Sequence, residues 1–319
     1  MHKLLATPVT ARSLIPGDGK KRIVMRISDL SLVCVLAGSL LIGASHSARA
    51  FDPDKVFGAE PEPHTILRYG YNALKEGRNE EALSAFRFGA VKNNLQSQWK
   101  LARMLQHGQG VARDPAAAYE LYEKIADRYA EIPPNRNDLP YVSDAVVTIG
   151  MARLSGIEGT HIGADPQIAE FYFYRAAALY GDAEAQYQLG KLYSGTEVGP
   201  IRPRSAAGWF ELASKKGHAG AQAELGQMLF YGKGIRKNRV LGLVYLTRAA
   251  ASSARGKFSH IKDLQRSALG QANAAQLAAA RKILSRLNIG ALTDPFQVVQ
   301  KDRAVLGLKS DVSEATENE

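Results

Sequence analysis

The sequence predicts an all-α protein, an α/α solenoid of about five helix-turn-helix repeats that ends in a helical cap at residues 256–288. Two repeated blocks predict this fold, one with a small residue, an apolar pair and a glycine-bearing turn, the other combining small and aromatic residues. The 29 glycines among 319 residues support it, because they favour many short elements separated by turns over one long helix.

The first block occurs at residues 95–111, 144–159, 183–199 and 219–235. Its small central residues, which we interpret as sites of close backbone approach, are Ala102, Gly150, Gly190 and Gly226. Its turn glycines are Gly108, Gly110, Gly232 and Gly234. We expect positive φ angles at these turns, because glycine alone adopts them at little cost.

The second block occurs at residues 118–126, 169–177, 206–214 and 242–250, and a unit at 66–90 follows the same scheme. Residues three and four apart share one helix face, so each block predicts a face of small and large residues. We therefore interpret as core the aromatic residues Tyr172, Phe173, Trp209, Phe210 and Tyr245. We expect the aromatics of one hairpin to fill the space beside the next, in a right-curving array over 66–255 with a concave face.

Residues 131–140 and 196–203 interrupt the array. Variation in loop length is the simpler interpretation of both, and a flexible loop that is sensitive to proteases or contacts a partner is the alternative. Before the array we expect an extended segment at 51–65. After the cap we expect an extension at 289–319 whose acidic end is disordered.

The first 50 residues resemble a secretory signal peptide. A basic stretch precedes the uncharged run at 30–44, and Ala48-Arg49-Ala50 follows, so we expect cleavage between Ala50 and Phe51. An uncleaved anchor is the alternative, but the run is short for a bilayer span, which needs about 20 apolar residues. Met25 is our hypothesis for the true start, since it leaves a signal of ordinary length. Cleavage predicts an exported chain without stable membrane insertion.

Cleavage would also change the charge and remove the single cysteine, Cys34. Residues 1–50 hold seven of the 41 Lys and Arg and two of the 31 Asp and Glu, so the net charge falls from +10 to +5. This excess is weak and dispersed, whereas nucleic-acid binding needs a dense basic surface. We therefore predict no nucleic-acid partner.

The sequence offers no motif for chemistry, and we predict no catalytic, cofactor-binding or metal-binding residue and no enzyme activity. The five histidines after residue 50 lack metal-ligand spacing: His64, His107, His161, His218 and His260. We interpret them as surface or turn residues, with pH sensing left open. Trp99 is the exception among the aromatics, and we predict a partly exposed anchor at a protein interface there.

The repeat blocks resemble the Sel1-like repeat family, relatives of the tetratricopeptide repeats, in their LG and G-x-G positions and their A-x-x-aromatic pairs. Three segments taken in order, FDP at 51–53, YGYNALKEGRNEEALSAFRFGA and SQWKLARMLQHGQGVARDPAAAYELYEKIA, resemble the rhizobial exopolysaccharide-production negative regulators. That resemblance implies a periplasmic regulator that binds the sensing domain of a membrane histidine kinase and holds it inactive. It also implies release by a periplasmic protease, favoured in acid, with control of exopolysaccharide synthesis and motility.

Two other readings remain. The first is an envelope scaffold or adaptor for cell-wall or secretion machinery. The second, a Sel1-type enzyme that hydrolyses β-lactams, is weaker, because such members are cysteine-rich and this chain keeps no cysteine after cleavage.

Overall fold

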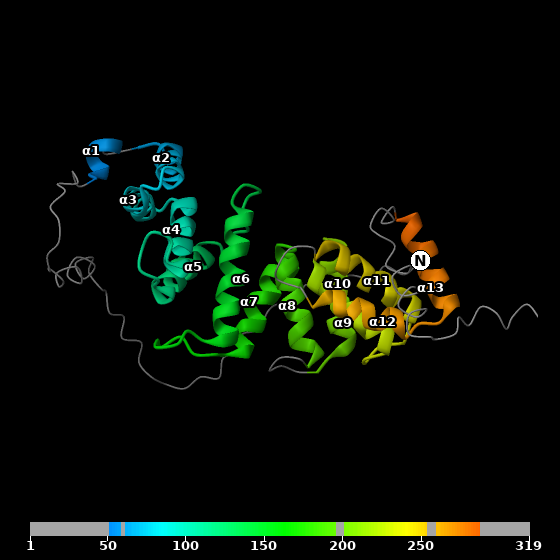
Figure 1. Ribbon diagram of the computed structural model, residues 1–319. Coiled ribbons are helices and arrows are strands. Elements are labelled where there is room, and N and C mark those ends of the chain that lie inside the picture. Colours follow the sequence, from blue (N-terminus) through cyan, green and yellow to red (C-terminus); the bar gives the residue numbers. More distant parts are fainter. Residues whose placement is uncertain (1–50, 59–60, 196–200, 254–259, 288–319) are drawn as a thin grey trace, which may run out of the picture. The chain divides into compact units, whose positions relative to one another are not determined.

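A computed structural model of the chain describes residues 51–58, 61–195, 201–253 and 260–287. These residues form thirteen α-helices and no strand, and they belong to one compact unit, Phe51–Glu319 (Figure 1). The all-helical fold predicted from the repeated blocks is confirmed. The predicted signal segment at 1–50 and the extension at 289–319 lie outside the described residues.

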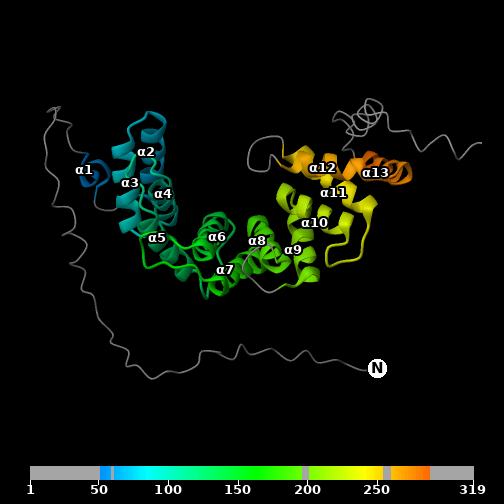
Figure 2. The same ribbon diagram turned by 60° about the horizontal axis from the view of Figure 1, so that its bottom comes forward.

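Ten of the described helices form five consecutive pairs, each helix packed against the next in the sequence (Figures 1 and 2). The pairs are α2 (Pro63–Lys75) with α3 (Asn79–Val91), α4 (Leu95–His107) with α5 (Pro115–Arg128), α6 (Leu139–Ser155) with α7 (Pro166–Leu179), α8 (Ala183–Ser194) with α9 (Pro203–Lys215), and α10 (Ala219–Tyr231) with α11 (Arg239–Ser252). Because contacts run mainly between neighbours in sequence, the described unit is a solenoid, as predicted.

Local capping chemistry sets the beginnings of several of these helices. Asp114 and Asp165 each accept a hydrogen bond from a backbone N–H of the first turn, and each is followed by a proline at the first helical position. The side chains of Asn94, Asp182 and Asn238 likewise accept a backbone hydrogen bond at the starts of α4, α8 and α11, which have no such proline. An oxygen acceptor and a pre-set proline φ both favour a helix start, so these boundaries are encoded in the sequence.

The segment at 51–65, predicted to be extended, contains a short helix, and that prediction was wrong. Residues Pro53–Phe57 form α1, capped by Asp52 and ended by Gly58. The rings of Phe51 and Phe57 lie 5.0 and 5.3 Å from the ring of Tyr69 in α2. This aromatic packing holds the segment against the first helix pair, which its sequence of polar and apolar residues did not indicate.

The fully buried aromatics of the second block pack within their own helix pair, which corrects in part our expectation that the aromatics fill the space beside the next. Trp209 of α9 does contact the neighbouring pair, at Tyr174 of α7. Phe173 and Phe210 are fully buried. A Cβ atom added at Gly150 would lie 2.7 Å from the ring of Phe173, and one at Gly190 would lie 2.4 Å from the ring of Phe210. The ring therefore occupies the space that glycine leaves on the facing helix of the same pair.

The five aromatics predicted as core divide into two groups. Phe173 and Phe210 lie in the largest core cluster, and Tyr172, Trp209 and Tyr245 are half-buried against that cluster. A helix has 3.6 residues per turn, so of two adjacent aromatics only one can point straight into the core.

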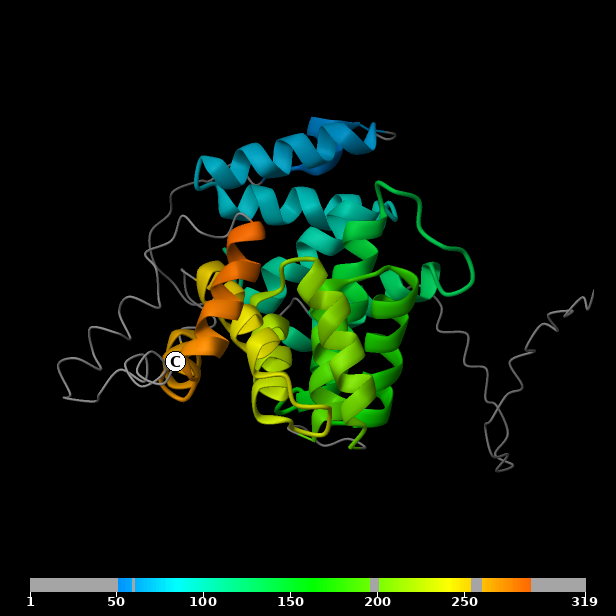
Figure 3. The ribbon, with the colours of Figure 1, turned by 90° about the vertical axis from the view of Figure 1, so that its right-hand side faces the viewer.

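Two further helices, α12 (Ile261–Gly270) and α13 (Ala274–Arg286), pack against α11 (Figure 3). Asn273 and Gln276 form a reciprocal capping box that starts α13. Leu269, Ala272 and Leu284 join Phe230 in a separate buried cluster. The two helices thus cover apolar residues that the last repeat would expose, as the predicted cap requires.

The first interruption of the array is an ordered turn. The Asn135 side chain accepts hydrogen bonds from the backbone N–H groups of Asn137 and Asp138 at 2.8 and 3.0 Å, and the Tyr129 hydroxyl donates to Asp138 at 2.8 Å. Of the second interruption, residues 196–200 lie outside the described residues.

Candidate functional site: an aromatic and basic cluster on α2, α4 and α6

The small residues singled out in the sequence lie at contacts between helices. Ala102 is fully buried, and Gly150 and Gly190 face the phenylalanine rings described above. A Cβ atom at Gly226 would lie 3.0 Å from a backbone nitrogen of α11 and 3.1 Å from the carbonyl oxygen of Gly242. The last repeat therefore brings two backbones, not a ring and a backbone, into contact.

The paired turn glycines combine a positive φ with a close approach to the preceding repeat. Gly108 and Gly232 end α4 and α10 in the left-handed region, at φ of 67° and 76°. Gly110 and Gly234, at 68° and 69°, each lie against another helix start. A Cβ atom at Gly110 would lie 2.4 Å from Asn79, and one at Gly234 would lie 2.3 Å from Pro203.

A buried glutamine, which the repeat pattern did not predict, joins successive repeats. In each case the amide nitrogen of the first helix donates to a carbonyl oxygen at the end of the preceding helix. The pairs are Gln98 with Ala90 at 3.3 Å, Gln186 with Ala177 at 3.2 Å and Gln222 with Ser214 at 3.3 Å. These bonds satisfy carbonyls that a helix end leaves without an intrahelical partner.

In the third repeat an arginine, and not a glutamine, donates to carbonyl oxygens of the preceding repeat. Val146 stands at the corresponding position, four residues before Gly150. There the Arg175 side chain of α7 donates to the carbonyl oxygens of Ala126 and Tyr129, at 3.0 and 2.5 Å. The recurrence of Gln four residues before the small anchor was the signal in the sequence for this contact.

Of the five histidines after residue 50, four are exposed, at positions 64, 107, 161 and 260. His218 is different. It caps α10, since its Nδ1 accepts from the N–H of Ala221 at 3.1 Å. Its ring stacks on Tyr187 at 4.5 Å, and its Nε2 lies 3.2 Å from a Glu184 carboxylate oxygen. His218 is therefore a structural cap that also contacts α8, which its position in a turn did not reveal.

Trp99 lies at the centre of a group of aromatic and charged side chains from three helices. We call this group the Trp99 cluster, and its members are Tyr71, Trp99, Lys100, Arg103, Tyr141 and Asp144. Trp99 is half-buried, and its indole ring packs edge-on against Tyr141 with centroids 5.1 Å apart. Its Nε1 donates a hydrogen bond of 2.6 Å to a carboxylate oxygen of Asp144.

Two cations lie over the rings of this cluster. The Arg103 guanidinium is 5.0 Å from the Trp99 ring, and Arg103 Nη1 is 3.9 Å from Asp144 Oδ2. The Lys100 ammonium is 5.6 Å from the ring of Tyr71. Tyr71 belongs to α2 and Asp144 to α6, so the cluster connects three successive repeats.

The partly buried environment of the cluster disfavours a charged side chain that has no counter-charge nearby. Burial, the largest cause, together with nearby Arg103, lowers the pKa of Lys100. Burial also raises the pKa of Tyr71, with a smaller raising contribution from Tyr141. Aromatic rings, an arginine and partial exposure together are typical of the residues that dominate protein interfaces. The cluster is therefore the candidate binding site, and contact of Trp99 with a partner stays a prediction.

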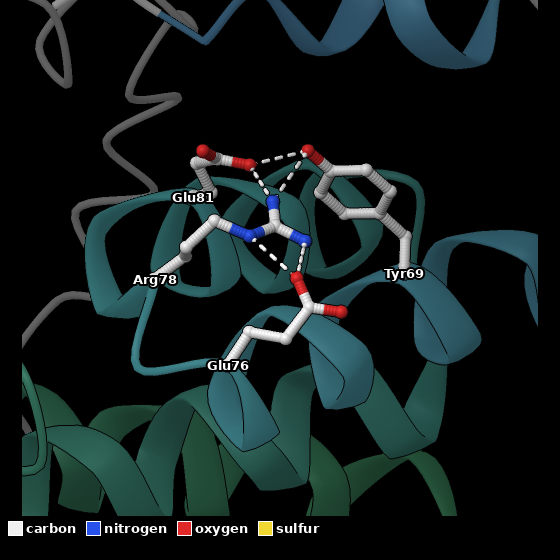
Figure 4. A network of polar contacts seen from close by, with 4 residues as sticks. All are labelled: Tyr69, Glu76, Arg78 and Glu81. Carbon is white, nitrogen blue, oxygen red and sulfur yellow. Dashed lines mark hydrogen bonds and ion pairs between the residues drawn. The ribbon is translucent and has the colours of Figure 1, made fainter.

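A second polar network, at the turn between α2 and α3, has a structural role (Figure 4). Arg78 donates to Glu76 at 2.9 and 2.6 Å, and it also bonds Glu81. The Tyr69 hydroxyl donates to the same Glu81. The bonds, of which that to Glu76 is the largest cause, raise the pKa of Arg78. The network ties the turn to both helices of the first pair.

An exposed aromatic surface on α7 was also not predicted from the sequence. Phe171 and Tyr174 are 62% and 54% exposed, although they neighbour the buried Phe173. Tyr174 lies edge-on to Trp209 of α9, with centroids 6.1 Å apart. Four consecutive aromatics on one helix cannot all face the core, and that run was the available signal.

Within the described ranges, no group of three or more His, Cys, Asp or Glu side chains could hold a metal ion. No helix among them is both long and apolar enough to cross a membrane.

The Sel1 repeat model matches residues 95–128, 149–180, 183–218 and 219–253, which correspond to the four pairs from α4 to α11. The chain is 34% identical over 229 residues to an exopolysaccharide production negative regulator from Rhizobium meliloti strain 1021, covering 70% of this chain and 83% of the relative. The chain belongs to this family of regulators. A regulator of the same name from Rhizobium leguminosarum bv. viciae is 32% identical over 192 residues, covering 60% and 71%.

A solved structure supports the fold of the family. The crystal structure of a Sel1 repeat protein from Oxalobacter formigenes is 25% identical, with a TM-score of 0.54, and the match covers 80% of this chain and 91% of that one. The resemblance to these regulators, which three segments indicated from their sequence and their order along the chain, is confirmed. Membership of the family supports a regulatory role carried by a protein-binding fold.

Proposed function

We propose that this chain is a periplasmic negative regulator that binds the sensing domain of a membrane histidine kinase and holds it inactive. Exopolysaccharide synthesis and motility would then follow the kinase output. The names of the two relatives support the regulatory role. The observation that carries the binding role is the Trp99 cluster, because it offers half-exposed tryptophan, tyrosine and arginine side chains across three repeats.

Export to the periplasm is part of the proposal. The signal-like pattern that ends at Ala50 supports it. The packing of Phe51 on Tyr69 is compatible with cleavage at that bond, since the new first residue would already have a place in the fold. Mass spectrometry of the protein purified from the periplasm tests this step, and an N-terminal peptide beginning at Phe51 is the expected result.

A deletion strain tests the regulatory function. We expect mucoid, poorly motile colonies with raised kinase-dependent transcription, and full restoration by the wild-type gene. Complementation with Arg103→Gln should restore less, because the variant removes a cluster cation. Lys124→Gln, an exposed position on α5, is the matched control and should restore fully. Unchanged kinase output with altered wall morphology would instead support an envelope scaffold.

We further propose that a periplasmic protease releases the kinase by degrading the regulator. An immunoblot after a shift from about pH 7 to 5.5, the range in which histidines gain charge, should show loss of the full-length chain before transcription rises. A stable chain during a full transcriptional response would contradict release by proteolysis.

A further inference from the structure

The Trp99 cluster contains more positive than negative charge. Its cations are Lys100 and Arg103, and its only carboxylate is that of Asp144. That carboxylate is already engaged, because Asp144 Oδ2 accepts the 2.6 Å hydrogen bond from Trp99 as well as facing Arg103 at 3.9 Å. One unit of positive charge is therefore left without a counter-charge inside the cluster.

Lys100 carries this unbalanced charge. It is a half-buried residue of α4, and it contacts the ring of Tyr71 on α2. Among the described residues no carboxylate forms an ion pair with it, and the charged group that acts on it is another cation, Arg103. A partly desolvated ammonium beside a guanidinium is electrostatically unfavourable, and an anion between the two would relieve both the desolvation and the repulsion.

The surroundings of the two cations suit a side chain on a protein segment. Tyr71 of α2 lies beneath the Lys100 ammonium, and Tyr141 of α6 packs on Trp99. Aromatic rings offer apolar contact to a side-chain stem, and Lys100 and Arg103 offer donors to its end.

We propose that Lys100 and Arg103 together bind an aspartate or glutamate side chain of an acidic segment in the protein partner. This inference rests on the proposed function only in taking the partner to be a protein. Asp144 orients the Trp99 ring and Arg103, so it is a positioning residue in this account. The pairing is electrostatic and only partly desolvated, so added salt should weaken it.

The chain provides its own reporter for a test. It has two tryptophans, Trp99 and Trp209, so the Trp209→Phe variant leaves Trp99 as the single fluorophore. The probes are two synthetic octapeptides, one alternating Glu and Ser and the other alternating Gln and Ser. We expect a saturable change in Trp99 emission with the Glu peptide and at least ~10-fold weaker binding of the Gln peptide.

Variants in the same background locate the effect. Lys100→Gln and Arg103→Gln should each weaken binding of the Glu peptide by about 10-fold, and Lys124→Gln should leave it unchanged. Circular dichroism confirms that each variant is folded. Equal affinities for the two peptides, no saturable signal, or an equal effect of Lys124→Gln would overturn the proposal.

A galacturonate oligomer provides the third probe, because sugar acids also present carboxylates. Tighter binding of the oligomer than of the Glu peptide would overturn the assignment to a protein segment. No kinase takes part in these measurements. A negative result would therefore overturn only the claim that Lys100 and Arg103 bind a carboxylate side chain. The deletion strain would still test the regulatory function.

Discussion

The close contact between α10 and α11 makes a quantitative prediction about Gly242. A Cβ atom there would lie 2.7 Å from the backbone nitrogen of Phe230 and 2.8 Å from the carbonyl oxygen of Gly226. Backbone atoms cannot rotate away as a side chain can, so Gly242→Ala must push the two helices apart. Gly208→Ala in α9 is the matched control, since its new Cβ atom would have no neighbour within 4 Å.

Two opposing effects set the size of the change. Alanine stabilises a helix interior by about 1 kcal/mol over glycine, and this gain applies to both variants. Overpacking a well-packed contact costs up to about 3 kcal/mol, and this loss applies to Gly242→Ala alone. We therefore expect Gly242→Ala to lower the free energy of unfolding by about 2 kcal/mol and Gly208→Ala to raise it by about 1 kcal/mol.

Urea unfolding followed by far-UV circular dichroism measures both variants against the wild type. The comparison uses the midpoint at constant slope, because a repeat protein can lose cooperativity when one contact is weakened. A Gly242→Ala variant as stable as wild type, or as stable as Gly208→Ala, would refute the close approach of α10 and α11.

Three further predictions concern single side chains. Gln222→Leu should cost about 1–2 kcal/mol, since it leaves the Ser214 carbonyl without its donor; hydrogen exchange at the α9–α10 turn should rise, and unchanged exchange would contradict the contact. His218→Ala should cost about 1 kcal/mol in urea unfolding, whereas His218→Asn should recover most of it as a good cap; equal losses would show that capping is not its role. Burial, the largest cause, raises the pKa of Glu224 above its ordinary value of 4.5, so the folded state holds that proton more tightly and ionised Glu224 reduces stability at neutral pH. Glu224→Gln should therefore raise the thermal midpoint at pH 7, with the gain disappearing as the pH falls to about 4.5, and a gain that persists there would contradict it.

The periodic part of the fold could be predicted from the sequence because small and aromatic residues recur at helical spacing. Gly150 and Gly190 could be predicted as sites of close approach, because the second block supplies the phenylalanines that face them, Phe173 and Phe210. Whether a ring packs on the other helix of its pair or on the next repeat could not be predicted, because spacing along one helix does not say what its face contacts. The short helix at 53–57 was missed because aromatic contacts to Tyr69 hold it.

Only part of the candidate site could be predicted from the sequence. Trp99 stood out because other repeats place different residues at its position, but its neighbours come from three helices far apart in the sequence. The distance of 45 residues between Trp99 and Asp144 has no local signature. Nothing in the sequence distinguishes Lys100 from other lysines on helices, and its lack of a counter-charge becomes visible only when Tyr71 and Arg103 are placed around it.

Photo-crosslinking in living cells tests the central claim most directly, that the Trp99 cluster binds the sensing domain of a histidine kinase. A photoreactive amino acid replaces Tyr141 in the cluster, or Lys124 on α5 as the control, in the deletion strain. We predict a crosslink to a kinase sensing domain from position 141 that is absent from position 124. No crosslink to a kinase from position 141, in a strain where that variant restores regulation, would contradict the account.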